Sequence, residues 1–307
     1  MAKQTDEFSE QYEFITNVII DYGWIITPHM IGKDFQKVYN LSNKILQNPP
    51  ANETDREKYQ NEINELLTDI IFHPLTRAFF VHRAKEVRHV QNFSHHLERA
   101  LLHYFKNDFF SVVLCLLPAI EGILLSYFGW QFGNARKPKI KDLIDEIEKC
   151  RIKTYDPVVY KLYAKTISIF LQKWIFTDTN TADTSLSFLN RHYVLHGMGA
   201  SNYYSLSDAN RLIMFFDLFI EFISIEQMVR YVFIPEENQS INTRFDYYHK
   251  LIEKDLKNSE ILKTEELFMS ENKNYFPEKN NPNWNQIMNR AVIEYMEIMK
   301  EIKKMRE

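Results

Sequence analysis

Cysteine and glycine are both scarce in this chain of 307 residues, which contains two cysteines and seven glycines. So few glycines disfavour folds rich in tight turns and phosphate sites built from glycine-rich loops. Cys115 and Cys150 form no CxxC pair, and two cysteines cannot build a disulfide framework, which indicates a reducing, cytoplasmic setting. Residues 1–8 lack the apolar run of a signal peptide.

A strong net charge is also missing, because 37 Lys and Arg against 41 Asp and Glu give a formal charge of −4. Proteins that coat nucleic acid non-specifically are usually basic overall, so any RNA contact must be a local patch. Hydrophobic residues make up 45% of the chain, which is enough for a sizeable core, and the 14% of aromatic residues argues against disorder.

One hydrophobic run, residues 109–130, has roughly the length needed to cross a bilayer. Pro118 and Glu121 interrupt its middle, and Asp108 and Arg136 flank it without an orienting charge bias. A carboxylate is costly in lipid, whereas a soluble bundle tolerates a paired one. We therefore predict a core helix and no membrane contact.

Apolar residues recur with helical periodicity nearly throughout, and no run alternates like a strand, which predicts an all-α fold. We expect an N-terminal helical region over 1–76, a helical core over 77–235 and a C-terminal helical appendage over 236–307. Thr54 and Glu57 predict a capping box, and Ser205 is expected to open the final core helix. The expected helices span residues 7–22, 31–46, 54–72, 77–105, 108–128, 139–150, 157–176, 184–196, 209–234, 244–256 and 284–305.

Arg191 and His196 form an Arg-x4-His motif that ends at Gly197, a helix-stopping residue. Arginine stays protonated at any working pH, while histidine both gives and takes a proton near neutrality. Such a pair suits phosphodiester cleavage, in which negative charge develops on phosphorus while protons move between oxygens. The helix end favours the imidazolium form of His196 and the nearby arginine opposes it, so this balance stays open.

The motif, with a polar His192 directly after the arginine, resembles the hallmark of the HEPN superfamily. Residues 116–124 (LLPAIEGIL) resemble the second core helix of bacterial relatives that pair IEGIL with a downstream RHxxLHG. The resemblance covers about residues 77–234, and its short motif alone arises often by chance. It implies a HEPN-like antiparallel helical bundle with N- and C-terminal helical extensions. Many members are metal-independent endoribonucleases of toxin–antitoxin, abortive-infection and CRISPR-linked antiviral defence systems.

Residue by residue, the resemblance implies that Arg191 stabilises the pentacoordinate phosphorus and that His196 is the general acid and base. The ribose 2′-hydroxyl would attack the adjacent phosphate without metal or cofactor and leave a 2′,3′-cyclic phosphate. Two motif helices would meet across the two-fold axis of a homodimer. The supporting candidates, for orienting Arg191 or holding the phosphate, are Glu121, Asn190, His192 and Tyr193.

Local basic residues are the candidates for contact with an RNA substrate, in two groups. An alternative interpretation is a solvated helix face and a solubilising loop. The groups are Arg88 and Arg99 on one expected helix, and Arg136, Lys137 and Lys139 in the loop after the apolar helix.

Two other interpretations compete with the nuclease. His192 and His196 have a spacing found in zinc sites, but no third ligand accompanies them, so we predict no metal. The second interpretation is that the chain is a non-catalytic binding or dimerisation module, which acts as a sensor or as the partner of another protein such as an antitoxin. Arg191 and Glu121 would then form only a structural salt bridge.

Overall fold

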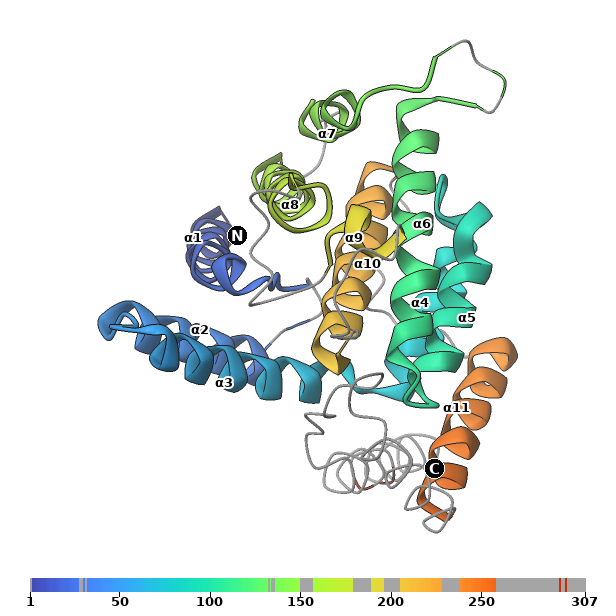
Figure 1. Ribbon diagram of the computed structural model, residues 1–307, viewed down its shortest axis with the longest axis horizontal. Helices are drawn as coiled ribbons and strands as arrows, with labels where there is room; N and C mark the ends of the chain where they lie inside the picture. The colour runs from blue at the N-terminus through green and yellow to red at the C-terminus, as the bar shows by residue number, and fades with distance from the viewer. Residues whose placement is uncertain are drawn as a thin grey trace.

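Helices supply all the regular secondary structure in the described part of the computed structural model, so the predicted all-α fold is confirmed (Figure 1). The structure describes residues 2–27, 30, 32–131, 133, 136–149, 157–178, 189–195, 205–227, 238–257, 293 and 296. The helices are α1 (Ala2–Ile19), α2 (Lys33–Gln47), α3 (Glu53–Ile71), α4 (Pro74–Ala84), α5 (Ser94–Tyr104), α6 (Phe109–Phe128), α7 (Ile140–Glu148), α8 (Pro157–Phe170), α9 (Arg191–Leu195), α10 (Leu206–Glu226) and α11 (Gln239–Lys257). Short helical turns are η1 (Ile20–Tyr22), η2 (Gln91–Phe93) and the π-helical η3 (Leu171–Ile175).

Capping residues explain where several of these helices begin. Ser205 opens α10 as predicted, with its hydroxyl accepting from the backbone of Asp208 at 3.2 Å. The predicted capping box of Thr54 and Glu57 is wrong, because Asn52 caps α3 instead and accepts from the backbone of Asp55 at 2.9 Å. An asparagine one residue before the first helical position can accept from the backbone N–H groups of the first turn, which have no partner within the helix.

The single long helix predicted over residues 77–105 is wrong, because this stretch forms α4, η2 and α5. Pro74 occupies the first turn of α4, where its missing N–H costs nothing. The chain leaves the helix after Ala84 and passes through His89, whose φ of 68° is left-handed. The break turns the chain so that α5 packs against α6.

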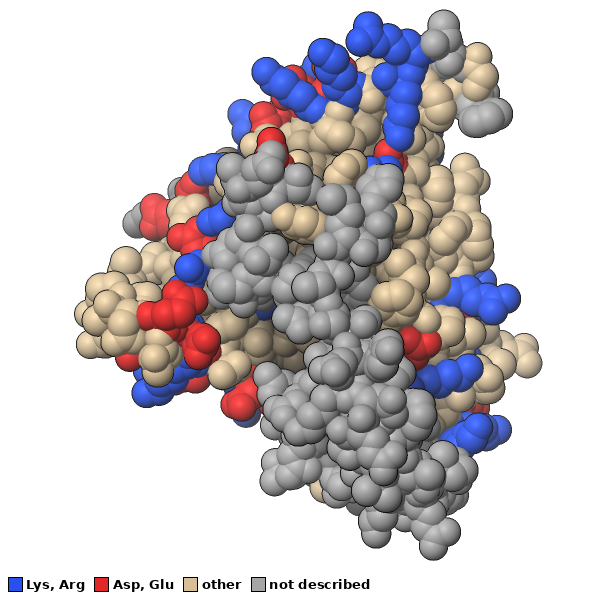
Figure 2. Space-filling model, viewed as in Figure 1, with Lys and Arg blue, Asp and Glu red and all other residues tan. Residues whose placement is uncertain are grey.

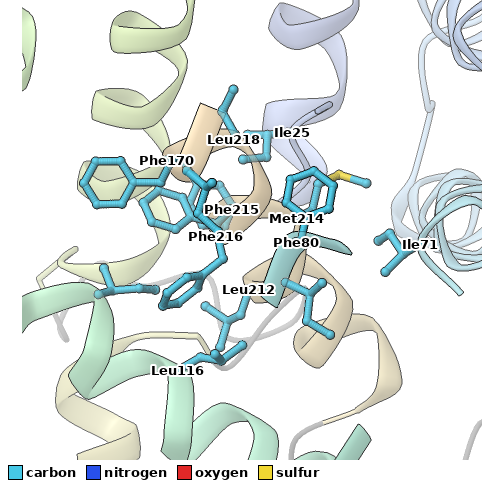
Figure 3. Packing of buried hydrophobic residues seen from close by; sticks show 14 of the residues in the cluster. Ile25, Ile71, Phe80, Leu116, Phe170, Leu212, Met214, Phe215, Phe216 and Leu218 are labelled. Atoms are coloured by element: carbon cyan, nitrogen blue, oxygen red, sulfur yellow. The ribbon is translucent and has the colours of Figure 1, made fainter. Parts of the chain in front are cut away.

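Helix α10 is the centre of the bundle, and nearly all of its residues from Leu206 to Ser224 are buried (Figure 3). Its neighbours include α3, α4, α6 and α8. Phe215 stacks on Phe170 of α8 with ring centroids 5.3 Å apart. A helix that is apolar on all sides must be covered on all sides, which is what the surrounding helices do.

A buried ion pair joins α10 to α4. Arg77 and Asp217 lie 2.7 Å apart, and each side chain is 1% exposed. Burial raises the pKa of Asp217 to about 6, although the Arg77 guanidinium opposes this shift. Arg77 also lies over the ring of Phe80, 5.2 Å from its centroid. The pair therefore fixes the register of α4 on the central helix.

The terminal regions pack on the core through polar contacts as well as apolar ones. Helix α1 packs against α8, and the Trp174 indole of η3 donates to the carbonyl of Ile20 at 2.9 Å. Helix α11 packs against α4, and Arg244 of α11 pairs with Glu98 of α5 at 2.9 Å. The predicted helix over 284–305 lies outside the described residues except for 293 and 296, which are helical.

Gly122, in the middle of α6, lets η2 approach this helix closely. A Cβ atom at Gly122 would overlap the ring of Phe93. We expect Gly122→Ala to lower the free energy of unfolding by about 1–3 kcal/mol, because the ring must leave its place. Urea denaturation followed by circular dichroism measures this loss.

The matched control for Gly122→Ala is the same substitution in a Phe93→Ala background. There the added methyl group has room, and alanine is the better helix former by about 1 kcal/mol. A loss of equal size in both backgrounds would show that the ring is not what the glycine accommodates.

Helix α6 is the helix in the described part of the chain that is long and apolar enough to cross a membrane. More than half of its apolar window, 56%, is buried inside the protein, where α6 packs against α5 and α10. This packing agrees with the prediction of a core helix.

Candidate functional site

The motif segment begins a helix where the sequence predicts the end of one. Residues 189 and 190 are not helical, and α9 begins at Arg191, so the predicted helix over 184–196 is wrong at these positions. The Asn190 side chain accepts from the backbone N–H groups of His192 at 2.9 Å and Tyr193 at 3.4 Å. Asparagine competes for backbone donors in this way at helix starts, which explains why the helix begins here.

Asn190 also anchors α9 to the rest of the fold. Its side chain is 3% exposed and donates to the carbonyl of Thr177 at 2.8 Å. Leu189 and Val194 are buried on the inner side of the same segment. Asn190, predicted to help hold a phosphate, is therefore placed as a buried cap that positions Arg191.

The centre of the site is the ion pair between Arg191 and Glu121 of α6. Arg191 Nε donates to Glu121 Oε2 at 2.5 Å, and the carboxylate side chain is only 10% exposed. A buried carboxylate in an otherwise apolar helix needs such a partner. Nε makes this bond, and the terminal guanidinium nitrogens form no hydrogen bond with another of the described residues.

A second cation, Lys137, lies on the other oxygen of the same carboxylate. Its ammonium group donates to Glu121 Oε1 and is 48% exposed at the side-chain level. Lys137 belongs to the loop between α6 and α7, which is held by a hydrogen bond of 3.0 Å from the Trp130 indole to the Arg136 carbonyl. The structure thus brings together one carboxylate and two cations from α6, this loop and α9.

Glu121, which is itself buried, also interrupts a partly exposed apolar stripe on α6. Leu114, Pro118, Leu125 and Phe128 flank it at spacings of four, three, four and three residues. Leu114 and Phe128 are each 36% exposed and Pro118 is exposed as well, whereas Leu125 is half-buried against the core. This spacing is that of a helix–helix seam, a signal that sequence reasoning missed because the run reads as uniformly apolar.

The other predicted site residues are only partly assembled. His192 is exposed on α9, Tyr193 is half-buried, and Lys139 lies directly before α7, with Arg136 beside Lys137. Arg88 and Arg99 are exposed on the α4–α5 side, and none of the described ion pairs joins them to Glu121 or Arg191. His196, the predicted acid and base, directly follows Leu195 and lies outside the described residues.

The stretch 77–105, expected to be one helix, contains histidines that the structure places on different elements. His89 lies in the α4–α5 connection, with its ring 3.0 Å from the Ser126 hydroxyl, while His95 and His96 lie on α5 with their ring centroids 4.0 Å apart and tilted by 49°. Burial, and secondarily His95, lowers the pKa of His96. Within the described ranges, no group of three His, Cys, Asp or Glu side chains has the arrangement of a metal site.

Comparison with known proteins gives no match to a family model, to a curated protein or to a solved structure.

Proposed function

We propose that this protein is a metal-independent endoribonuclease of HEPN type that acts as a homodimer in the cytoplasm. The observation that carries the proposal is the Arg191 guanidinium, held through Nε by Glu121 at the start of α9. A guanidinium oriented in this way presents its remaining N–H groups to an anionic ligand in a fixed geometry. That is what the stabilisation of a charged phosphorus centre requires.

The reaction then follows from the residue types. His196 takes the proton from a ribose 2′-hydroxyl, whose oxygen bonds to the adjacent phosphorus. Arg191 stabilises the charge of the pentacoordinate centre, the bond from phosphorus to the 5′-oxygen breaks, and that oxygen receives a proton. The products are a 2′,3′-cyclic phosphate and a 5′-hydroxyl end. No step uses a metal ion or a cofactor.

The α6 stripe supports the proposed homodimer. Apolar residues with heptad spacing pair with another helix, and Glu121 lies at the centre of the stripe. Pairing of two such stripes about a two-fold axis near Glu121 brings two Arg191 side chains into one cleft. One histidine then accepts a proton while the other donates one. We place the protein in a bacterial antiviral-defence or toxin–antitoxin setting, where a regulatory partner or antitoxin restrains it.

The test is incubation of the purified protein with RNA in EDTA, with cleavage ends analysed chemically. We expect cleavage that leaves 2′,3′-cyclic phosphates, and a loss of about 100-fold or more in His196→Ala. The control is His95→Ala, an exposed histidine on α5. Growth arrest on expression is scored for the same variants, because a restrained nuclease still acts in the cell. Intact RNA together with normal growth would overturn the proposal.

The second candidate is a non-catalytic HEPN-like module that binds or dimerises. It is favoured by the same Glu121–Arg191 pair, because a buried carboxylate needs a cation whether or not any reaction occurs. Light scattering separates the candidates when combined with the assay. If the protein is a dimer that neither cleaves RNA nor arrests growth, the non-catalytic module is the correct candidate.

A further inference from the structure

The single carboxylate of Glu121 forms ion pairs with two cations. Lys137 occupies Oε1 and Arg191 occupies Oε2, so one negative charge faces two positive charges. The three groups together carry one excess positive charge beside the apolar stripe of α6. Such a cluster attracts an anion, because its positive charge is only half compensated.

The two cations differ in how firmly they are held. Arg191 is 26% exposed at the side-chain level and belongs to a helix that the Asn190 cap fixes in place. Lys137 is about half exposed and belongs to a loop. Water screens the half-exposed ammonium group, and the long lysine side chain loses entropy in one geometry, which weakens the pair although the Glu121 side chain is only 10% exposed. Lys137 can therefore exchange its carboxylate for another anion, because Arg191 keeps its position and leaves the buried carboxylate paired.

Further cations lie on both sides of Lys137, in the loop and on the first turn of α7. Arg136, Lys139 and Lys141 are all exposed, and none of them makes an ion pair with another described residue. Lys and Arg side chains gather at the end of the molecule where this loop and α7 lie (Figures 1 and 2). The backbone of the loop is fixed at both ends, by Trp130 on Arg136 and by the Lys139 N–H, which donates to Asp142 at 3.0 Å.

We propose that Lys137 is a second phosphate-binding residue of the site, and that it leaves Glu121 to bind the phosphodiester adjoining the one on Arg191. This inference rests on the proposed function. The substrate strand then runs from Arg191 over residues 136–139 of the loop and the first turn of α7, and not over α5 past Arg88 and Arg99. The ligand is a single strand of RNA whose backbone phosphates, and not its bases, make these contacts.

The experiment uses a single-stranded RNA with 2′-O-methyl groups throughout, which lacks the attacking hydroxyl and is not cleaved. Its binding to the full-length protein is measured by fluorescence anisotropy over a range of salt concentrations. Each phosphate contact contributes about 0.7 to the slope of log K against log salt for a single strand. We expect Lys137→Ala to weaken binding about 3- to 10-fold at low salt and to reduce the slope by about 0.7.

Two variants make the result specific to Lys137. Arg99→Ala removes one exposed positive charge from α5 and is expected to leave both affinity and slope unchanged. Glu121→Gln removes the charge that holds both cations and is expected to tighten binding. A Lys137 that only neutralised Glu121 would give a destabilised Lys137→Ala protein with the wild-type slope.

The inference is overturned if Lys137→Ala and Arg99→Ala behave alike, or if the slope of Lys137→Ala equals that of the wild type. If the wild-type protein cleaves ordinary RNA but the salt slope of Lys137→Ala equals that of the wild type, this inference fails and the proposed function stands. A wild-type protein that neither cleaves RNA nor binds the methylated strand removes the proposed function, and this inference with it.

Discussion

Replacement of Arg191 by alanine is expected to lower the rate of RNA cleavage by about 100- to 1000-fold, the usual cost of removing one donor from a charged transition state. In the proposed reaction the guanidinium would contact the phosphate through its terminal N–H groups, since Nε donates to Glu121. Because the charge on phosphorus grows as the reaction proceeds, the loss falls mainly on the rate of the chemical step and less on binding.

Single-turnover cleavage in EDTA measures this rate, and thermal unfolding shows whether the variant is folded. Arg191→Lys keeps the charge but lacks the planar fork, so we expect it to recover only a small part of the activity. Glu121→Gln should lower the rate while leaving the charge of Arg191 in place. A folded Arg191→Ala protein that cleaves at the wild-type rate would make Arg191 a structural partner of Glu121 and favour the binding module.

Replacement of Arg211 by alanine is expected to lower the free energy of unfolding by about 3–5 kcal/mol, the cost of breaking a buried ion pair. Arg211 lies at the start of α10, 2.9 Å from Asp208, and its side chain is 1% exposed. Its guanidinium covers the ring of Trp24, 4.9 Å from the centroid, and donates to the carbonyl of Tyr22 at 3.4 Å. One side chain thus joins the N-terminal region to the central helix.

Chemical denaturation of the full chain measures this loss. The control is Lys173→Ala, which removes a cation from the same junction but from its surface, where Lys173 pairs with Asp21 at 2.6 Å. Exposed pairs contribute about 0–1 kcal/mol, so this variant should resemble the wild type. Losses of equal size in the two variants would contradict the role of burial at Arg211.

Local patterns in the sequence were sufficient for the helical class and for several helix boundaries. The Ser205 cap and the break between the helices expected over 54–72 and 77–105, where Pro74 lies, depend on neighbouring residues alone, so they could be predicted. The turn between α4 and α5 could not, because the residues around His89 are compatible with a helix. Their path is set by packing of η2 and α5 on α6, which no local pattern contains.

In the candidate site, too, features set by neighbouring residues differ from features set by tertiary packing. Glu121 stood out because a carboxylate in an apolar helix requires a partner, and Arg191 is that partner in the fold. The sequence predicts a helix that ends before Gly197 and already includes residues 189 and 190. In the structure α9 starts only at Arg191, because the Asn190 side chain accepts hydrogen bonds from the backbone of His192 and Tyr193. The contact of Lys137 with Glu121 depends on how a loop returns to α6, and spacing along the chain does not encode that.

The position of α10 in the chain has a consequence for synthesis. This helix is buried around its whole circumference, yet it begins only at residue 206 of 307. During translation, helices α3, α4, α6 and α8 leave the ribosome before the helix that they enclose has been made. Their apolar inner faces therefore stay exposed to solvent until α10 has been synthesised. Nascent chains stalled before residue 206 are expected to be the species most prone to aggregate or to recruit chaperones.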